Sequence, residues 1–414
     1  MWKIKQIGLF VLCLCTLLLW YNTIIYQQQM IWFDNSISVY WENNTGVSPQ
    51  QINKLLNWQK KDGGILPPLV LSKPYSNQML YGDLYSALAI GEVLEYYGDI
   101  SYLIPCQFQS GYWPEDNKGC VIDDGIAHTL WGSSDVLGRL IQWNGLTWYV
   151  RGVIKGTNNL AIFPTEKNNV SLFSNLWLDL SEIGGSCLFA EQLLQKYQLP
   201  LGTITDLGLF VWLAKIITTV PVFFLWGCII FNAITRLWNL RHTKILFFLS
   251  IPLLVLIITV ISQIAGFPWS IPDRFLPTRW SNNLFWLELG KQILNGILTI
   301  FRTSLTVWEK IFWVNFFYCF ILAVPTVIFM WFTIMVLPPF TFQSIFWYSL
   351  IWWFELLGII YWSHNTLYGN PPFTLWIFPT IWMILKWLLN LHMKWLKPKK
   401  YSNERGLLNE TKLF

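Results

Sequence analysis

The chain has 414 residues, of which 54% are hydrophobic and only 12% are charged. A soluble domain carries about 25% charged residues, so this composition excludes an ordinary soluble protein and indicates a membrane protein. The net charge of +5 is small, and the placement of Lys and Arg is more informative because cytoplasmic loops collect them. We therefore expect the lipid bilayer as a partner and no nucleic acid.

Residues 1–27 are predicted to form a short cytoplasmic tip and a first transmembrane helix. Lys3 and Lys5 precede an apolar run from Ile7 to about Tyr26, which is long enough to cross a bilayer. The run does not end in the small residues of a signal-peptide cleavage site, so an uncleaved anchor is favoured. The two lysines place the N-terminus in the cytoplasm and the next segment outside.

Residues 28–205 have the composition of a soluble domain, and we call them the outer domain. Alternation of Ile37, Val39 and Trp41 with polar residues predicts a half-buried strand. Ser48 and Pro49 predict a helix start that continues to residues 61–64. Further strands are expected at 65–71, 120–123 and 177–180, and further helices at 85–97, 126–131 and 186–197. Mixed strands and helices predict one extracellular α+β domain, with room for two lobes.

A β-hairpin is predicted within Asp135–Ile154. Leu140 to Trp143 alternates apolar and polar residues, and Thr147 to Ile154 is a second β-rich run. The dipeptide Asn144-Gly145 joins them, and it tolerates the positive φ angles of a tight hairpin turn.

The chain after about residue 206 is predicted to be membrane-embedded. We expect six spans in all, with both termini in the cytoplasm, because this arrangement satisfies the distribution of Lys and Arg. Residues 284–305 carry charges along an apolar helix, which favours an amphipathic helix in the outer interface over a span. The predicted segments are helices 2 and 3 with a short basic loop in 206–266, an outer loop and the interfacial helix in 267–310, helices 4–6 in 311–396, and a basic cytoplasmic tail in 397–414.

The sequence contains no phosphate-binding loop, nucleophile elbow or zinc-protease motif. We therefore predict no catalytic residue, no cofactor and no metal, and no enzyme. The acidic pairs Glu115-Asp116 and Asp123-Asp124 are explained by loop and cap roles. Glu355 lies within a predicted span, where a charge costs a few kcal/mol. It is either a residue of a substrate or proton pathway or a neutral carboxyl that fixes helix packing, and the second reading is favoured.

Cys106 and Cys120 are the two nearby cysteines of the outer domain. In an extracellular domain they could form a disulfide that closes a short loop, or they could both stay reduced. Cys187 is left over in either case, which argues against a dense disulfide framework.

The stretch from Cys120 to Ile154 resembles the periplasmic core domain of MacB-type (FtsX-like) ABC transporter permeases. The matching residues are Ala127, Leu130, Gly132, Asp135, Gly138, Asn144-Gly145 and Gly152-Val153-Ile154. Gly111 to Asp116 is similar to the segment that enters this domain in the family. The order of one span, a large outer domain and a second long span agrees with the family.

The resemblance implies a permease subunit of the bacterial plasma membrane that works as a homodimer or heterodimer with a separate ATP-binding subunit. Arg236, Arg241 and Lys244 form the cytoplasmic loop that would couple to this ATPase. The loop is shorter than its counterpart in the family, which also has four spans rather than six. We expect coupling of ATP hydrolysis to the outer domain for export or mechanotransmission. The alternative is a non-transporting accessory or sensor protein that retains the outer domain.

Overall fold

The computed structural model groups the chain into two compact units. Unit 1 comprises Met1–Gln28, Ala214–Pro268 and Phe317–Phe414, and unit 2 comprises Gln29–Leu213 and Trp269–Phe316. The structure describes residues 2–42, 45–62, 66–83, 87–102, 106–157, 159–181, 187–239, 283–302, 305–336 and 342–363, together with positions 252, 255, 259, 263, 380, 383, 384 and 387.

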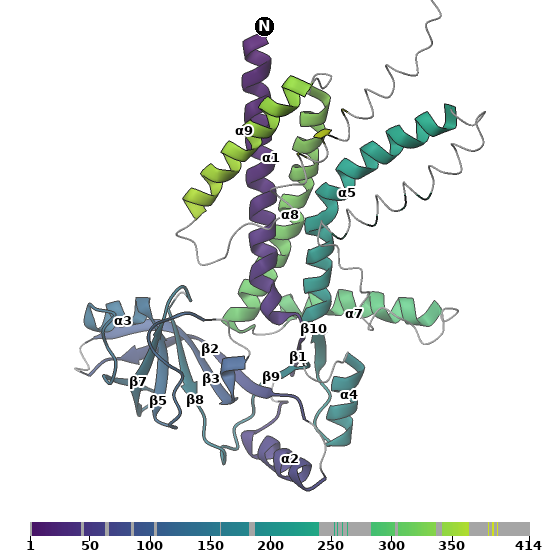
Figure 1. The fold of residues 1–414 in the computed structure, drawn as a ribbon. Helices are drawn as coiled ribbons and strands as arrows, with labels where there is room; N and C mark the ends of the chain where they lie inside the picture. Colours follow the sequence, from purple (N-terminus) through teal and green to yellow (C-terminus); the bar gives the residue numbers. More distant parts are fainter. Residues whose placement is uncertain are drawn as a thin grey trace, which may run out of the picture. The chain divides into compact units, whose positions relative to one another are not determined.

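Unit 2 is built on one sheet (Figure 1). Its strands in the described part of the chain follow the order β10-β1-β9-β2-β3-β8-β5-β7-β4, and β6 pairs with β2 and β7. The pairs β3–β8 and β5–β7 are parallel, and the other pairs are antiparallel. The strands are β1 (Ser36–Tyr40), β2 (Leu69–Tyr81), β3 (Leu88–Gly98), β4 (Phe108–Gly111), β5 (Gly119–Asp123), β6 (Leu140–Trp143), β7 (Leu146–Ile154), β8 (Leu160–Pro164), β9 (Asn175–Asp179) and β10 (Thr203–Asp206).

The sheet carries two separate hydrophobic cores, which makes unit 2 an α+β structure with two lobes. Helices α2 (Pro49–Asp62) and α4 (Cys187–Lys196) cover the end with β1 and β9, where Ile52 and Leu194 are buried with Val39 and Leu178. Helix α3 (Asp124–Trp131) covers the other end, with Ile126 buried near strands β5, β7 and β8.

The predicted hairpin is confirmed. Strands β6 and β7 pair with Ile141 opposite Trp148, and Asn144 and Gly145 form the turn with φ angles of 51° and 77°. Two positive φ angles at the turn match the right-handed twist of the strands, which is why Asn-Gly is favoured there. The helix start at Ser48 is also confirmed, since the Ser48 N–H donates to Gln51 Oε1 at 2.9 Å.

The helix predicted for 85–97 is wrong, because this stretch forms strand β3. Apolar residues occupy both faces of β3, with Leu88 and Ile90 exposed on one and Ala89 and Val93 buried on the other, so the strand period is hidden in the sequence. Gly91 approaches the main chain of Asn159 so closely that an added Cβ would lie 2.4 Å from its oxygen. Pairing with β2 and β8 therefore overrides the local preference for a helix.

Two other expectations need correction. Strand β2 begins after Pro67-Pro68 rather than at residue 65, and it runs on to Tyr81. Strand β1 is buried on both faces rather than on one. The elements expected at 120–123, 126–131, 177–180 and 186–197 are present, with ends shifted by one or two residues.

Unit 1 is helical. It includes parts of α1 (Trp2–Met30), α5 (Leu207–Asn239) and α8 (Val307–Val336), together with α9 (Phe342–Ser363). Three described segments are long and apolar enough to cross a membrane, namely Phe10–Phe33, Leu207–Cys228 and Val307–Met335. The apolar part of α9, Phe346–Ile359, is shorter. The spans expected at 245–265 and 373–395 lie almost entirely outside the described residues, as does the tail at 397–414. Helix α7 (Asn283–Arg302) belongs to unit 2.

Candidate functional site

Helix α8 begins with a capping box, and its acidic residue is fully buried. The main-chain N–H and the hydroxyl of Thr306 both donate to Glu309 Oε2 at 2.9 Å, and the Glu309 N–H lies 3.4 Å from Thr306 Oγ1. This reciprocal arrangement satisfies main-chain donors that a helix start leaves free. One carboxylate oxygen of Glu309 is thereby engaged within its own helix.

The other oxygen of Glu309 is held by strand β1. The hydroxyl of Tyr40, the last residue of β1, donates a hydrogen bond to Glu309 Oε1. Burial and the neighbouring Glu309 carboxyl raise the pKa of Tyr40 well above its ordinary value, so the phenol keeps its proton and acts as a donor. Both oxygens of the buried carboxyl therefore have donors, which avoids the cost of an unsatisfied buried acceptor.

Strand β1 is also connected to two other helices. It follows α1 after the short helix η1 (Ile31–Phe33), and it pairs with β9 on one side and β10 on the other. Strand β10 continues into α5 without a loop, and its last residue caps that helix, because Asp206 Oδ1 accepts from the Leu209 N–H at 3.1 Å. We call the set of β1, β10, Tyr40 and Glu309 the strand–helix joint.

Aromatic side chains surround the strand–helix joint. Phe33 meets Phe312 edge to face, with ring centroids 5.3 Å apart, and it also lies against Trp177 of β9. Phe210 of α5 meets Trp313 of α8 with centroids 4.7 Å apart. Such pairs contribute about 0.5–1.5 kcal/mol beyond their buried area. Aromatic packing therefore joins η1, α5, α8 and the sheet at this place, in addition to the Tyr40–Glu309 hydrogen bond.

The sequence predictions include neither residue of this hydrogen bond. Thr306-Val307-Trp308-Glu309 precedes an apolar run, which is the local pattern of a capping box, so the start of α8 and the role of Glu309 could have been predicted. No local signal identifies Tyr40 as the partner, because the two residues are 269 positions apart.

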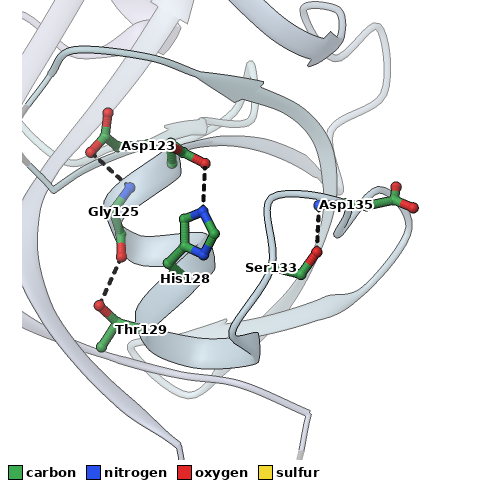
Figure 2. Close-up of polar contacts among 7 residues, drawn as sticks. Asp123, Gly125, His128, Thr129, Ser133 and Asp135 are labelled. Carbon is green, nitrogen blue, oxygen red and sulfur yellow. Dashed lines mark hydrogen bonds and ion pairs between the residues drawn. The ribbon is translucent and has the colours of Figure 1, made fainter.

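The acidic residue before α3 has a structural role (Figure 2). The buried carboxylate of Asp123 accepts from the Thr157 N–H and hydroxyl at 3.1 and 2.7 Å, from the Asn159 N–H at 3.0 Å and from the Gly125 N–H at 3.2 Å. It caps α3, as expected for this acidic pair. His128 is half-exposed, and its Nε2 atom lies 3.4 Å from Asp124 Oδ1.

The remaining predicted site residues are not brought together. Cys106 and Cys120 are free thiols. Burial raises the pKa of Cys106 to about 12 and raises that of Cys120 further, so neither forms a reactive thiolate near neutral pH. Glu355 is buried in the core of unit 1, and within the part of the chain that the structure describes its two oxygens have no hydrogen-bond partner. The choice between a pathway residue and a packing residue stays a prediction. Arg236 lies in α5, while Arg241 and Lys244 are outside the described residues.

Among the residues that the structure describes, no group of three or more His, Cys, Asp or Glu side chains could hold a metal ion. The buried acidic residues that the structure describes in unit 2 stabilise helix starts. Asp123, Asp206 and Glu309 all lie at helix starts and accept main-chain N–H or side-chain O–H donors there. These three carboxyl groups stabilise the starts of helices that adjoin the sheet.

Three helices long and apolar enough to cross a membrane, together with the sheet of unit 2, indicate a membrane protein with an α+β outer domain. Solved structures that are similar to this domain include outer domains of ABC-type transporters. The periplasmic region of MacB from Actinobacillus actinomycetemcomitans is 13% identical, with a TM-score of 0.34 over 42% of this chain and 89% of that chain. The extracellular domain of the noncanonic ABC-type transporter YknZ from Gram-positive bacteria is 17% identical, with a TM-score of 0.31 over 41% of this chain and 97% of that chain.

No protein-family model and no curated protein sequence matches the chain. The likeness to the solved domains concerns the fold alone.

Proposed function

We propose that the protein is a permease-like membrane subunit in which the strand–helix joint transmits motion between membrane helices and the outer domain. The observation that carries the proposal is the buried hydrogen bond from Tyr40 to Glu309, together with the direct continuation of β10 into α5. Through these connections α1, α5 and α8 all converge on one pair of strands.

Strand β1 is suited to pass on a displacement because it lies inside the sheet. It is hydrogen-bonded to β9 through Ser36–Tyr40 and to β10 through Ile37–Tyr40. A close-packed, hydrogen-bonded strand cannot slide alone, since a shift of one residue would turn its buried side chains to the other face. A movement of α1, α5 or α8 is therefore transmitted to the sheet as a rigid displacement.

The energy for such a movement would come from a separate ATP-binding subunit, which we propose as the partner of a permease homodimer or heterodimer. Arg236, Arg241 and Lys244 are the residues proposed to contact it on the cytoplasmic side. The buried acids of unit 2 support a mechanical rather than an enzymatic role, because Asp123, Asp206 and Glu309 are all occupied as helix caps.

The first test is purification of the full chain in mild detergent from the membranes of its own cells. We expect an ATP-binding subunit to co-purify, to hydrolyse ATP in the complex, and to be lost when Arg236 and Arg241 are both replaced by Ala. Absence of such a subunit would overturn the ABC-transporter assignment and favour the accessory or sensor alternative.

The second test addresses the joint itself. In the purified complex, trapping the ATP-bound state should change the hydrogen exchange of β1 and β10, and Tyr40→Phe should diminish this change while ATP hydrolysis persists. A matched Tyr149→Phe variant, at an exposed position of β7, should behave like the unmodified protein. An unaltered response in Tyr40→Phe would show that the joint does not transmit motion.

A further inference from the structure

Helix α7 uses one apolar face to pack on the sheet and on the start of α5. Leu289 is buried on this face, and Gly296 lies directly against Phe210. A Cβ added at Gly296 would lie 2.9 Å from the Phe210 ring and 3.5 Å from the side chain of Thr205 in β10. Because Gly296 has no side chain, α7 packs closely against the place where β10 continues into α5.

A second apolar face of α7 is left exposed. Leu287, Leu294 and Phe301 follow one another at intervals of seven residues, so they lie in line along one side of the helix. Their exposed fractions are 60%, 56% and 79%, and the neighbouring Trp286 is 45% exposed. The exposed polar residues Glu288, Gln292 and Asn295 form a separate stripe. A helix on a soluble surface carries one apolar stripe, and the second indicates another apolar environment.

The position of α7 identifies that environment. Phe210, against which Gly296 packs, is the fourth residue of Leu207–Cys228, a segment apolar and long enough to cross a membrane. The end of a span lies at the bilayer surface, so a helix packed on it lies at the same level. Trp286 fits this depth, because indole rings favour the boundary between headgroups and acyl chains. The mixed charges of α7, from Glu288, Lys291 and Arg302, also suit the headgroup layer.

We propose that α7 lies in the membrane interface on the side of the outer domain, with Leu287, Leu294 and Phe301 directed to the acyl chains of the bilayer. One face then binds lipid while the other holds β10 and the start of α5. Helix α7 thereby fastens the edge of the sheet to the bilayer surface next to the strand–helix joint. The inference depends on the membrane location of α5 and is independent of any ATPase partner.

The test uses the full chain with the photoreactive residue p-benzoylphenylalanine at Leu294 or at Asn295, reconstituted in vesicles of phosphatidylethanolamine and phosphatidylglycerol. The two positions are adjacent, both are exposed, and they lie on different faces of α7. After irradiation, mass spectrometry should find lipid adducts at position 294 at several times the yield at position 295. Equal yields, or a cross-link from position 294 to a second copy of the chain, would overturn the proposal.

A second measurement needs no variant. The unmodified chain is irradiated in vesicles that contain a lipid with a diazirine in its acyl chain, and labelled peptides are mapped. Label is expected on the Leu287, Leu294 and Phe301 face of α7 and also in 317–335 of α8, which serves as the positive control. Label in α8 without label in α7 would show that the exposed face does not meet lipid.

Discussion

The hydroxyl of Tyr40 in strand β1 donates a hydrogen bond to the carboxyl of Glu309 in helix α8, across 269 positions of the chain. Both side chains are almost fully buried. The same carboxyl closes the capping box with Thr306, so a single side chain stabilises the start of a helix and connects that helix to the sheet.

Replacing Tyr40 by Phe should lower the free energy of unfolding by about 1–3 kcal/mol, the range for leaving a buried hydrogen-bond acceptor without its donor. The loss arises because Glu309 Oε1 is left buried without its donor. Denaturant unfolding of the detergent-solubilised chain measures it. In a double-mutant cycle, Tyr40→Phe should cause a much smaller loss of stability in the Glu309→Gln variant than in the unmodified protein.

The control for this cycle is the neighbouring ion pair of Lys310 and Glu92, which has an N–O distance of 2.7 Å and is partly exposed. Lys310→Met should cost less than about 1 kcal/mol, because solvent screens exposed pairs. If Lys310→Met costs as much as Tyr40→Phe, the effect reflects a general weakening of α8 and not the Tyr40–Glu309 bond.

Two glycines with similar backbone angles should respond differently to Ala. Gly145 has φ +77° and open space around an added Cβ, so Gly145→Ala should cost about 1 kcal/mol from backbone strain alone. Gly111 has φ +78°, and its added Cβ would lie 2.0 Å from the Arg151 oxygen, so Gly111→Ala should cost more than about 3 kcal/mol. Thermal unfolding of the two variants provides the comparison, and equal losses would contradict the close approach of β4 to β7.

Asp123→Asn should destabilise the outer domain by about 2–3 kcal/mol. The Asp123 carboxylate accepts from Thr157, Asn159 and Gly125, and the Asn amide group would place a donor against one of these donors. Hydrogen exchange of α3 and of residues 155–160 should increase. Asp124→Asn is the matched control, because Asp124 is paired with the half-exposed His128 and does not cap the helix. Comparable effects at both positions would refute the special role of Asp123.

Glu355→Met should raise the thermal stability of the chain, corresponding to about 1–3 kcal/mol. Among the described residues neither oxygen of the buried Glu355 has a hydrogen-bond partner, and Met fills a similar volume without desolvating a polar group. Glu355→Gln, which keeps a buried polar group, should give no such gain. A fall in stability with Met would mean that Glu355 is stabilised by a partner and is not a destabilising carboxyl retained at a functional position.

Several elements of this protein follow from interactions between residues that are close together in the sequence. Asn144-Gly145 specified the hairpin because few dipeptides adopt two positive φ angles, and Ser48 to Gln51 specified the start of α2 through its capping box. The apolar runs near residues 10–33, 207–228 and 307–335 identified membrane helices because backbone polar groups in lipid must be satisfied within a helix.

Contacts between distant residues were decided only by the tertiary structure. The residues of β3 predict a helix by their sequence, but pairing with β2 and β8 determines their conformation. The hydrogen-bond partner of Glu309 and the packing of Gly296 against Phe210 could not be predicted, since each depends on elements that are remote in the chain. The sequence alone therefore determined the Asn-Gly turn, the start of α2 and the apolar helices, because each depends on neighbouring residues. The packing of the sheet determined the strand β3 and the residues that connect helices to the sheet.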